Sequence, residues 1–167
     1  MKKLNIVLLS ILFLVGISFN ANAETVLLEP DDYAGMTFWV ISMACLATTV
    51  FIFIERGSIA LSWRPALTVV GIITGIAFLN YLYIRGIWVN NKDLPIVYRY
   101  LEWLITMQLI MSVFYFLLSA VRKVASIIFW KLILGTLIIV YGGYAGEVGD
   151  LPAFFGFMIW MVGWIFI

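Results

Sequence analysis

Apolar residues form five long runs in this sequence, and short segments that hold most of the charged residues separate them. A helix needs about 20 apolar residues to cross a hydrocarbon core of roughly 30 Å. Four runs reach that length, whereas the fifth starts near Pro152 and is still apolar at Ile167, the last residue. The pattern predicts transmembrane helices over residues 33–54, 65–85, 95–121 and 124–144, and a fifth helix from residue 152.

Short connections join these predicted helices, at residues 55–64, 86–94 and 145–151. Neighbouring helices should therefore lie antiparallel and side by side, as in an up-and-down bundle. Asp31 or Asp32 is placed to cap the first helix, and Pro65 stands in the first turn of the second. The predicted fold class is an all-α membrane protein.

The composition excludes or disfavours several classes of protein and site. Of the 167 residues, 65% are hydrophobic and 11% are charged, which excludes a soluble domain. The sequence has no histidine and one cysteine, Cys45, so an intrachain disulfide is excluded and a metal centre is a weak interpretation. It offers no pattern of nucleophile and base either, and we do not expect an enzyme.

The first 23 residues have the features of a signal peptide. Lys2 and Lys3 precede an apolar stretch at residues 6–17, and Ala21-Asn22-Ala23 provides a small-residue cleavage pattern. We therefore expect cleavage after Ala23 and a membrane domain over residues 24–167. An uncleaved first helix is the weaker alternative, because the apolar stretch is short.

Charged residues indicate how the domain is oriented and what it does not bind. Without Lys2 and Lys3, eight of the ten basic residues remain against nine acidic ones, a balance that does not favour nucleic acid. An excess of basic residues marks the cytoplasmic side of a membrane protein. The loops expected on that side hold Arg56, Arg64, Arg122 and Lys123, against Arg85 and Lys92 on the other. This distribution predicts that the amino terminus lies outside the cytoplasm.

Arg99 and Glu102 lie inside the run at residues 95–121. A charge within the hydrocarbon core costs several kcal/mol, so intramembrane ionisable residues are usually functional. Residues three apart share one helix face, and we expect the guanidinium and the carboxylate to offset each other. Such a pair indicates a proton relay, an ion path or the counter-ion of a ligand. The alternative is a pair that only fastens two helices together.

Other side chains share the face of this pair or lie near it. Trp103 and Thr106 continue the stripe, and Val113 returns to almost the same angle about 16 Å further along. Trp103 can form a flat wall for a conjugated ligand or simply pack. Gln108 lies on a different face of the predicted helix, and we expect its polar side chain to need a hydrogen-bond partner on an adjacent helix.

The segment from Arg99 to Thr106 resembles the third-helix signature of microbial rhodopsins, Arg-Tyr-x-Asp-Trp-Leu-x-Thr. Further stretches look like those of proteorhodopsins, at residues 32–39, 68–78, 81–86 and 143–149. The likeness covers nearly all of the predicted membrane domain, in order. It implies a fold of seven transmembrane helices around retinal, which is joined as a protonated Schiff base to a lysine of the seventh helix.

The resemblance also implies roles for single residues. Glu102 matches the counter-ion and primary proton acceptor, and Arg99 matches the arginine of the counter-ion complex. The matching positions for contact with retinal are Trp103, Thr106, Ile110 and Tyr81. Retinal, protons and the lipid bilayer are the implied partners, and the family often forms homo-oligomeric rings.

The sequence departs from the family pattern in its number of helices and at single residues. It ends after five predicted helices, so we expect it to be the first five of seven. None of its lysines, Lys131 included, matches the lysine that binds retinal. Val113 replaces the carboxylate that returns a proton in the pumps, which implies a slow photocycle. Asn80 replaces a histidine found in many proteorhodopsins, and Gln108 replaces a proline.

The leading hypothesis is a retinal-binding, light-driven proton transporter or photoreceptor. One alternative is a photosensory rhodopsin without net transport. A second is a non-photoactive, truncated membrane scaffold, which the missing lysine favours.

Overall fold

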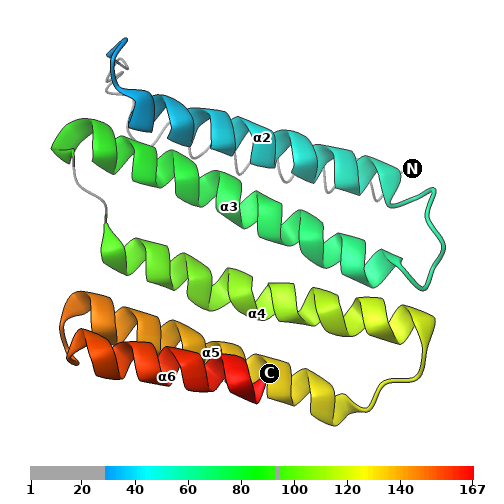
Figure 1. Ribbon diagram of the computed structural model, residues 1–167. Coiled ribbons are helices and arrows are strands. Elements are labelled where there is room, and N and C mark those ends of the chain that lie inside the picture. Colours follow the sequence, from blue (N-terminus) through cyan, green and yellow to red (C-terminus); the bar gives the residue numbers. More distant parts are fainter. Residues whose placement is uncertain (1–28, 93–94) are drawn as a thin grey trace.

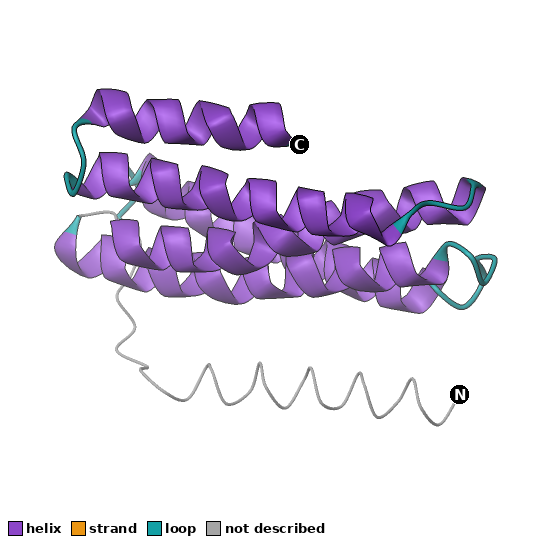
Figure 2. Ribbon diagram, turned by 90° about the horizontal axis from the view of Figure 1, so that it is seen from below, coloured by secondary structure: helices purple, strands orange, loops and turns teal. Residues whose placement is uncertain are grey.

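A computed structural model describes residues 29–92 and 95–167 of the chain. The predicted signal peptide at residues 1–23 lies outside these residues. The described part contains five helices: α2 (Tyr33–Glu55), α3 (Arg64–Asn91), α4 (Ile96–Val121), α5 (Ser126–Val148) and α6 (Ala153–Phe166). The helices run along a common direction and alternate in sense (Figures 1 and 2). Helices α2 to α5 are long and apolar enough to cross a membrane, and α6 is a shorter apolar helix.

Each described helix packs against its neighbours in the chain. The contacting pairs are α2 with α3, α3 with α4, α4 with α5, and α5 with α6. Figure 1 shows the same succession, from α2 at the top to α5 and α6 at the bottom. The predicted up-and-down helical bundle is therefore confirmed, and it places the middle helix, α4, between α3 and α5.

Two helices extend further than the sequence predicted. We expected α3 to end at Arg85, but it continues to Asn91, and α5 continues past Tyr144 to Val148. The 28 residues of α3 span about 42 Å, more than a hydrocarbon core of roughly 30 Å. Polar residues near its end therefore fit a helix that projects beyond the core. The left-handed backbone of Lys92 (φ 54°) ends α3, and that of Gly149 (φ 90°) ends α5.

Polar and small residues fix the contacts between helices. Thr49 of α2 and Thr74 of α3 share a hydrogen bond of 2.7 Å between their hydroxyl oxygens. The hydroxyl of Thr136 in α5 donates to Oε1 of Gln108 in α4 at 2.8 Å, which confirms the expected partner on an adjacent helix. Where α5 meets α6, a Cβ atom on Gly156 would lie 2.6 Å from Cα of Gly146, so these backbones touch.

Candidate functional site

A cavity of about 220 Å³ lies where α2, α3 and α4 meet. It brings together Glu102 of α4 and Tyr81 of α3, two residues that the sequence analysis singled out from separate segments. The lining residues are Phe38, Asn80, Tyr81, Ile84, Pro95, Arg99, Glu102 and Trp103. The cavity therefore combines aromatic walls with a carboxylate, a guanidinium, an amide and a phenol.

Glu102 is half-buried at the wall of this cavity. One turn further along α4, the hydroxyl of Thr106 donates to the backbone carbonyl of Glu102 at 2.9 Å. Thr106 is 4% exposed, so this bond is sheltered. Among the described residues the Glu102 carboxylate forms no ion pair. Glu102 thus places an acidic group inside a predominantly apolar helix with no cation bound to it.

The expected ion pair between Arg99 and Glu102 is wrong. Nη2 of Arg99 instead pairs with Oε1 of Glu147, near the end of α5. The reason is the antiparallel packing of the two helices. Arg99 lies one turn from the start of α4 and Glu147 lies next to the last residue of α5, so the two helix ends meet. Both side chains are about one-third exposed there (32% and 38%), which lowers the desolvation penalty of pairing.

Tyr100 completes the contact with Glu147. Its hydroxyl donates to Oε2 of Glu147 at 2.7 Å, so each carboxylate oxygen has a partner from α4. The Tyr100 ring also packs edge-on against Trp103 and Tyr144, with ring centroids 5.3 and 5.4 Å apart. The sequence analysis missed Glu147 as a site residue. Its place at one end of α5, opposite the start of α4 in an antiparallel pair, is the signal that could have found it.

Trp103 both lines the cavity and packs against neighbouring side chains. Its indole lines the cavity beside Glu102, and it is 41% exposed. Cζ of Arg99 lies 5.8 Å from the Trp103 ring and 5.5 Å from the Tyr100 ring, within the range of cation–π attraction. The guanidinium is thus fixed by two rings and by Glu147, while it still borders the cavity.

The remaining predicted contact residues differ in position. Tyr81 lines the cavity and stacks on Phe38, with ring centroids 6.3 Å apart. Ile110 lies eight residues beyond Glu102, about 12 Å along α4, and is outside the set that lines the cavity. The structure therefore brings Glu102, Arg99, Trp103 and Tyr81 together, with Thr106 one turn away.

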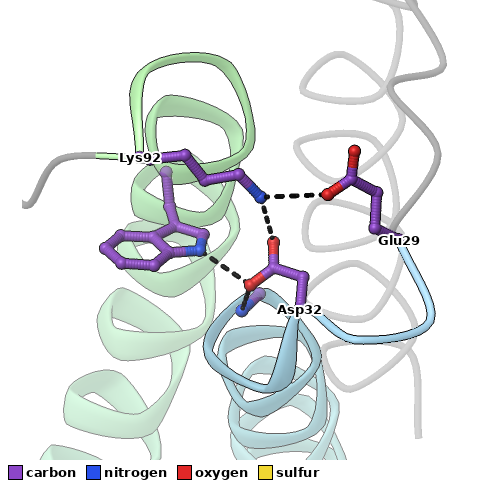
Figure 3. Close-up of polar contacts among 5 residues, drawn as sticks. Glu29, Asp32 and Lys92 are labelled. Atoms are coloured by element: carbon purple, nitrogen blue, oxygen red, sulfur yellow. Dashed lines mark hydrogen bonds and ion pairs between the residues drawn. The ribbon is translucent and has the colours of Figure 1, made fainter.

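A charged cluster outside the membrane-spanning segments fixes the relative position of α2 and α3 (Figure 3). Oδ1 of Asp32 caps α2 by accepting from the Gly35 amide at 2.9 Å, and it also accepts from the Trp88 indole at 2.9 Å. Nζ of Lys92 lies 2.9 Å from Oδ2 of Asp32 and 3.8 Å from Glu29. Asp31 and Asp32 were both expected as possible caps of α2, and Asp32 is the residue that caps it.

Hydrogen bonds in this cluster favour the charged forms of both partners. The Gly35 amide, and then the Lys92 ammonium and the Trp88 indole, lower the pKa of Asp32 from 3.8 to about 2. The bond to Asp32 raises the pKa of Lys92 above its usual value. The cluster joins the start of α2 to the end of α3, and those two helices supply Phe38, Asn80, Tyr81 and Ile84 to the cavity. It therefore helps to hold the cavity walls in place.

These surroundings determine what the site can do chemically. A carboxylate without a bound cation at a cavity wall can stabilise a positively charged ligand or accept a proton. Flat aromatic side chains beside it favour a conjugated, apolar ligand. Within residues 29–92 and 95–167, no group of three or more histidine, cysteine or acidic side chains could hold a metal ion.

Sequence comparison finds relatives over most of the chain. The family model of bacteriorhodopsin-like proteins matches residues 32–167. The chain is 42% identical over 139 residues to the green-light absorbing proteorhodopsin of Gamma-proteobacterium EBAC31A08, covering 83% of this chain and 56% of that protein. Identity to the blue-light absorbing proteorhodopsin of Gamma-proteobacterium Hot 75m4 is 44%, covering 55% of that protein. The chain thus spans little more than half the length of the curated relatives it matches.

Solved structures show the same helical arrangement. The crystal structure of blue light-absorbing proteorhodopsin from Med12 aligns with a TM-score of 0.72 and 39% identity, covering 81% of this chain and 64% of that one. Exiguobacterium sibiricum rhodopsin aligns with a TM-score of 0.67 and 28% identity, covering 80% and 59% of the two chains.

Proposed function

Because the chain belongs to the bacteriorhodopsin-like family, we propose that it functions as a retinal-binding, light-driven proton transporter or photoreceptor of the proteorhodopsin type. Glu102 is the counter-ion and proton acceptor in this proposal. The observation that carries it is the position of Glu102, half-buried at the cavity and without an ion pair among the described residues. The membrane would be the inner membrane of a bacterium, with the amino terminus outside.

The residues of the cavity fit the family's chromophore. Bound retinal supplies a cationic linkage whose proton affinity changes with light. Glu102 offers the negative charge that such a cation needs, and the Trp103 indole offers a flat, partly exposed wall. Tyr81 adds a second aromatic surface from α3. The lysine that would hold retinal does not match any lysine of this sequence.

The partners of Arg99 define its part in the proposal. The guanidinium borders the cavity that contains Glu102, yet its ion pair is with Glu147. Arg99 therefore contributes positive potential near Glu102 without occupying the carboxylate. Glu102 stays ready to take up a proton, and Arg99 acts as a positioning residue of the counter-ion complex.

We propose that the return of the proton is the slow step of the photocycle. Val113 lies eleven residues beyond Glu102 on α4, about 16 Å towards the other end of the helix. An aliphatic side chain cannot relay a proton. A proton that enters from this side must therefore be carried by water or by a residue elsewhere. A slow cycle suits a light sensor at least as well as an efficient pump.

The test uses the product of the natural reading frame, reconstituted with retinal in lipid vesicles. Illumination should change the pH of the medium, and Glu102→Gln should reduce that change at least tenfold because the acceptor is gone. Glu55→Gln is the matched control, since Glu55 is an exposed carboxylate at the opposite end of the bundle. An unchanged signal in Glu102→Gln would contradict the proposal.

The same preparation separates the alternatives. A coloured protein with no net proton movement would support a photosensory rhodopsin. A colourless protein would support the non-photoactive scaffold.

A further inference from the structure

A second cavity, shallow and largely open, with a volume of about 530 Å³, lies at the opposite end of the bundle from the Asp32 cluster. It is formed by the end of α2, the start of α3 and the last turns of α4. Arg56 and Arg64 line it together with apolar side chains, among them Leu61, Val69 and Phe116. We propose that this cavity binds the headgroup and upper acyl chain of an anionic phospholipid.

The depth of the cavity fits a lipid at the membrane boundary. Arg56 directly follows α2 and Arg64 begins α3. Both arginine side chains are therefore attached at the level where the helices leave the apolar core. Val69 and Phe116 each lie five residues inside a helix end, about 7 Å deeper. Positive charge at the surface and apolar walls below it match the order of phosphate and acyl chain in a phospholipid.

Arg64 is held in place by the loop that precedes α3. Its Nε donates to the carbonyl of Ile59 at 2.9 Å, and one Nη donates to the carbonyl of Gly57 at 3.0 Å. A guanidinium has five N–H donors, and these two bonds use two of them. The group is therefore pre-oriented at the cavity wall with donors left for a phosphate oxygen.

Charge at this end of the bundle favours an anionic lipid over a zwitterionic one. Arg122 and Lys123 follow α4 at the same end and add to the positive potential. Glu55 is the opposing carboxylate here; it accepts a hydrogen bond from Ser58 at 3.0 Å and does not line the cavity. Basic pockets between transmembrane helices are known sites for acidic headgroups.

Native mass spectrometry of the delipidated protein in neutral detergent tests this site without retinal or light. Dioleoyl phosphatidylglycerol should bind more tightly than dioleoyl phosphatidylcholine. Arg56→Gln should weaken the phosphatidylglycerol complex about fivefold. The Arg56 side chain is exposed, so this variant leaves the helix contacts intact. Arg64→Gln should have a larger effect, because it also releases the loop carbonyls.

Arg122→Gln is the matched control, since it removes one positive charge at the same end but outside the cavity. Its effect should stay below twofold. Equal losses in Arg56→Gln and Arg122→Gln would show general surface attraction and overturn the proposal. Equal affinity for the two lipids would overturn it too. So would displacement of phosphatidylglycerol by inorganic phosphate at similar concentrations, because the site would then recognise phosphate and not a lipid.

Discussion

Glu147 and Glu102 lie on adjacent helices, α5 and α4, and their carboxylates have different partners. Each oxygen of Glu147 accepts a hydrogen bond, one from Arg99 and one from Tyr100. Glu102 lines a cavity and forms no ion pair among the described residues. Arg99 lines the same cavity as Glu102 but pairs with Glu147. The comparison indicates that Glu147 joins helices, whereas Glu102 is available for a proton or a cation.

Loss of Arg99 should have the largest effect on stability. Arg99→Gln removes the ion pair with Glu147 and the contacts with the Tyr100 and Trp103 rings. The pair is partly exposed, so the expected loss lies between those of surface and buried pairs, about 2 kcal/mol of unfolding free energy. Denaturant unfolding in detergent measures it. A loss no larger than that of Arg122→Gln, an exposed arginine outside these contacts, would contradict the account.

The two glutamates should respond differently to the same substitution. Glu147→Gln keeps an acceptor for Tyr100 but removes the charge that pairs with Arg99, at about 1 kcal/mol. Glu102→Gln removes a charge from inside the membrane and breaks no ion pair among the described residues, so stability should stay within about 0.5 kcal/mol or rise. The same unfolding assay compares them. Equal destabilisation by both variants would show that Glu102 also has a structural partner.

Tyr100→Phe isolates the hydroxyl from the ring. It removes the 2.7 Å bond to Glu147 and leaves the edge-on packing with Trp103 and Tyr144 in place. The expected loss is about 0.5–1 kcal/mol, below that of Glu147→Gln. In the Glu147→Ala background the same substitution should have almost no effect, and a double-mutant cycle checks this. Additive losses would mean that the hydroxyl acts through another group.

The Asp32 cluster should show a local effect that depends on pH. The pKa of Asp32 is about 2 in the folded protein and 3.8 ordinarily, so the unfolded chain takes up a proton first as pH falls. The stabilisation is therefore complete above about pH 4 and is lost as the pH falls through about 2. The protection of the Gly35 amide against exchange, relative to an unfolded chain at the same pH, should therefore fall as the pH falls through this range, because this amide donates to Asp32. Asp32→Asn should lack this pH dependence, and an identical profile in the variant would contradict the assignment.

Much of the fold was predictable, because long apolar runs are almost sufficient by themselves to specify membrane helices. The starts of α2 and α4 and the need of Gln108 for a partner all followed from local pattern. The ends of α3 and α5 did not, since a helix that projects beyond the hydrocarbon core can carry polar residues. Arg85 and Gly86 therefore looked like an end but lie within α3.

The site was predictable to a lesser degree. Glu102, Arg99 and Trp103 were expected to share a helix face, and they line one cavity together with Tyr81. The partner of Arg99 could not be read from spacing along one helix, because it comes from α5. Pairing across helices depends on where the helix ends meet, and that requires the lengths of both helices. Position along α4 likewise put Ile110 outside the cavity.

Infrared difference spectroscopy tests most directly whether Glu102 is the carboxylate that takes up a proton. The sample is the retinal-reconstituted product of the natural reading frame, compared in darkness and under light. A C=O stretching band of a protonated carboxylic acid should appear on illumination, persist in Glu147→Gln and vanish in Glu102→Gln. A band that survives in Glu102→Gln, or that is lost in Glu147→Gln, would contradict the account.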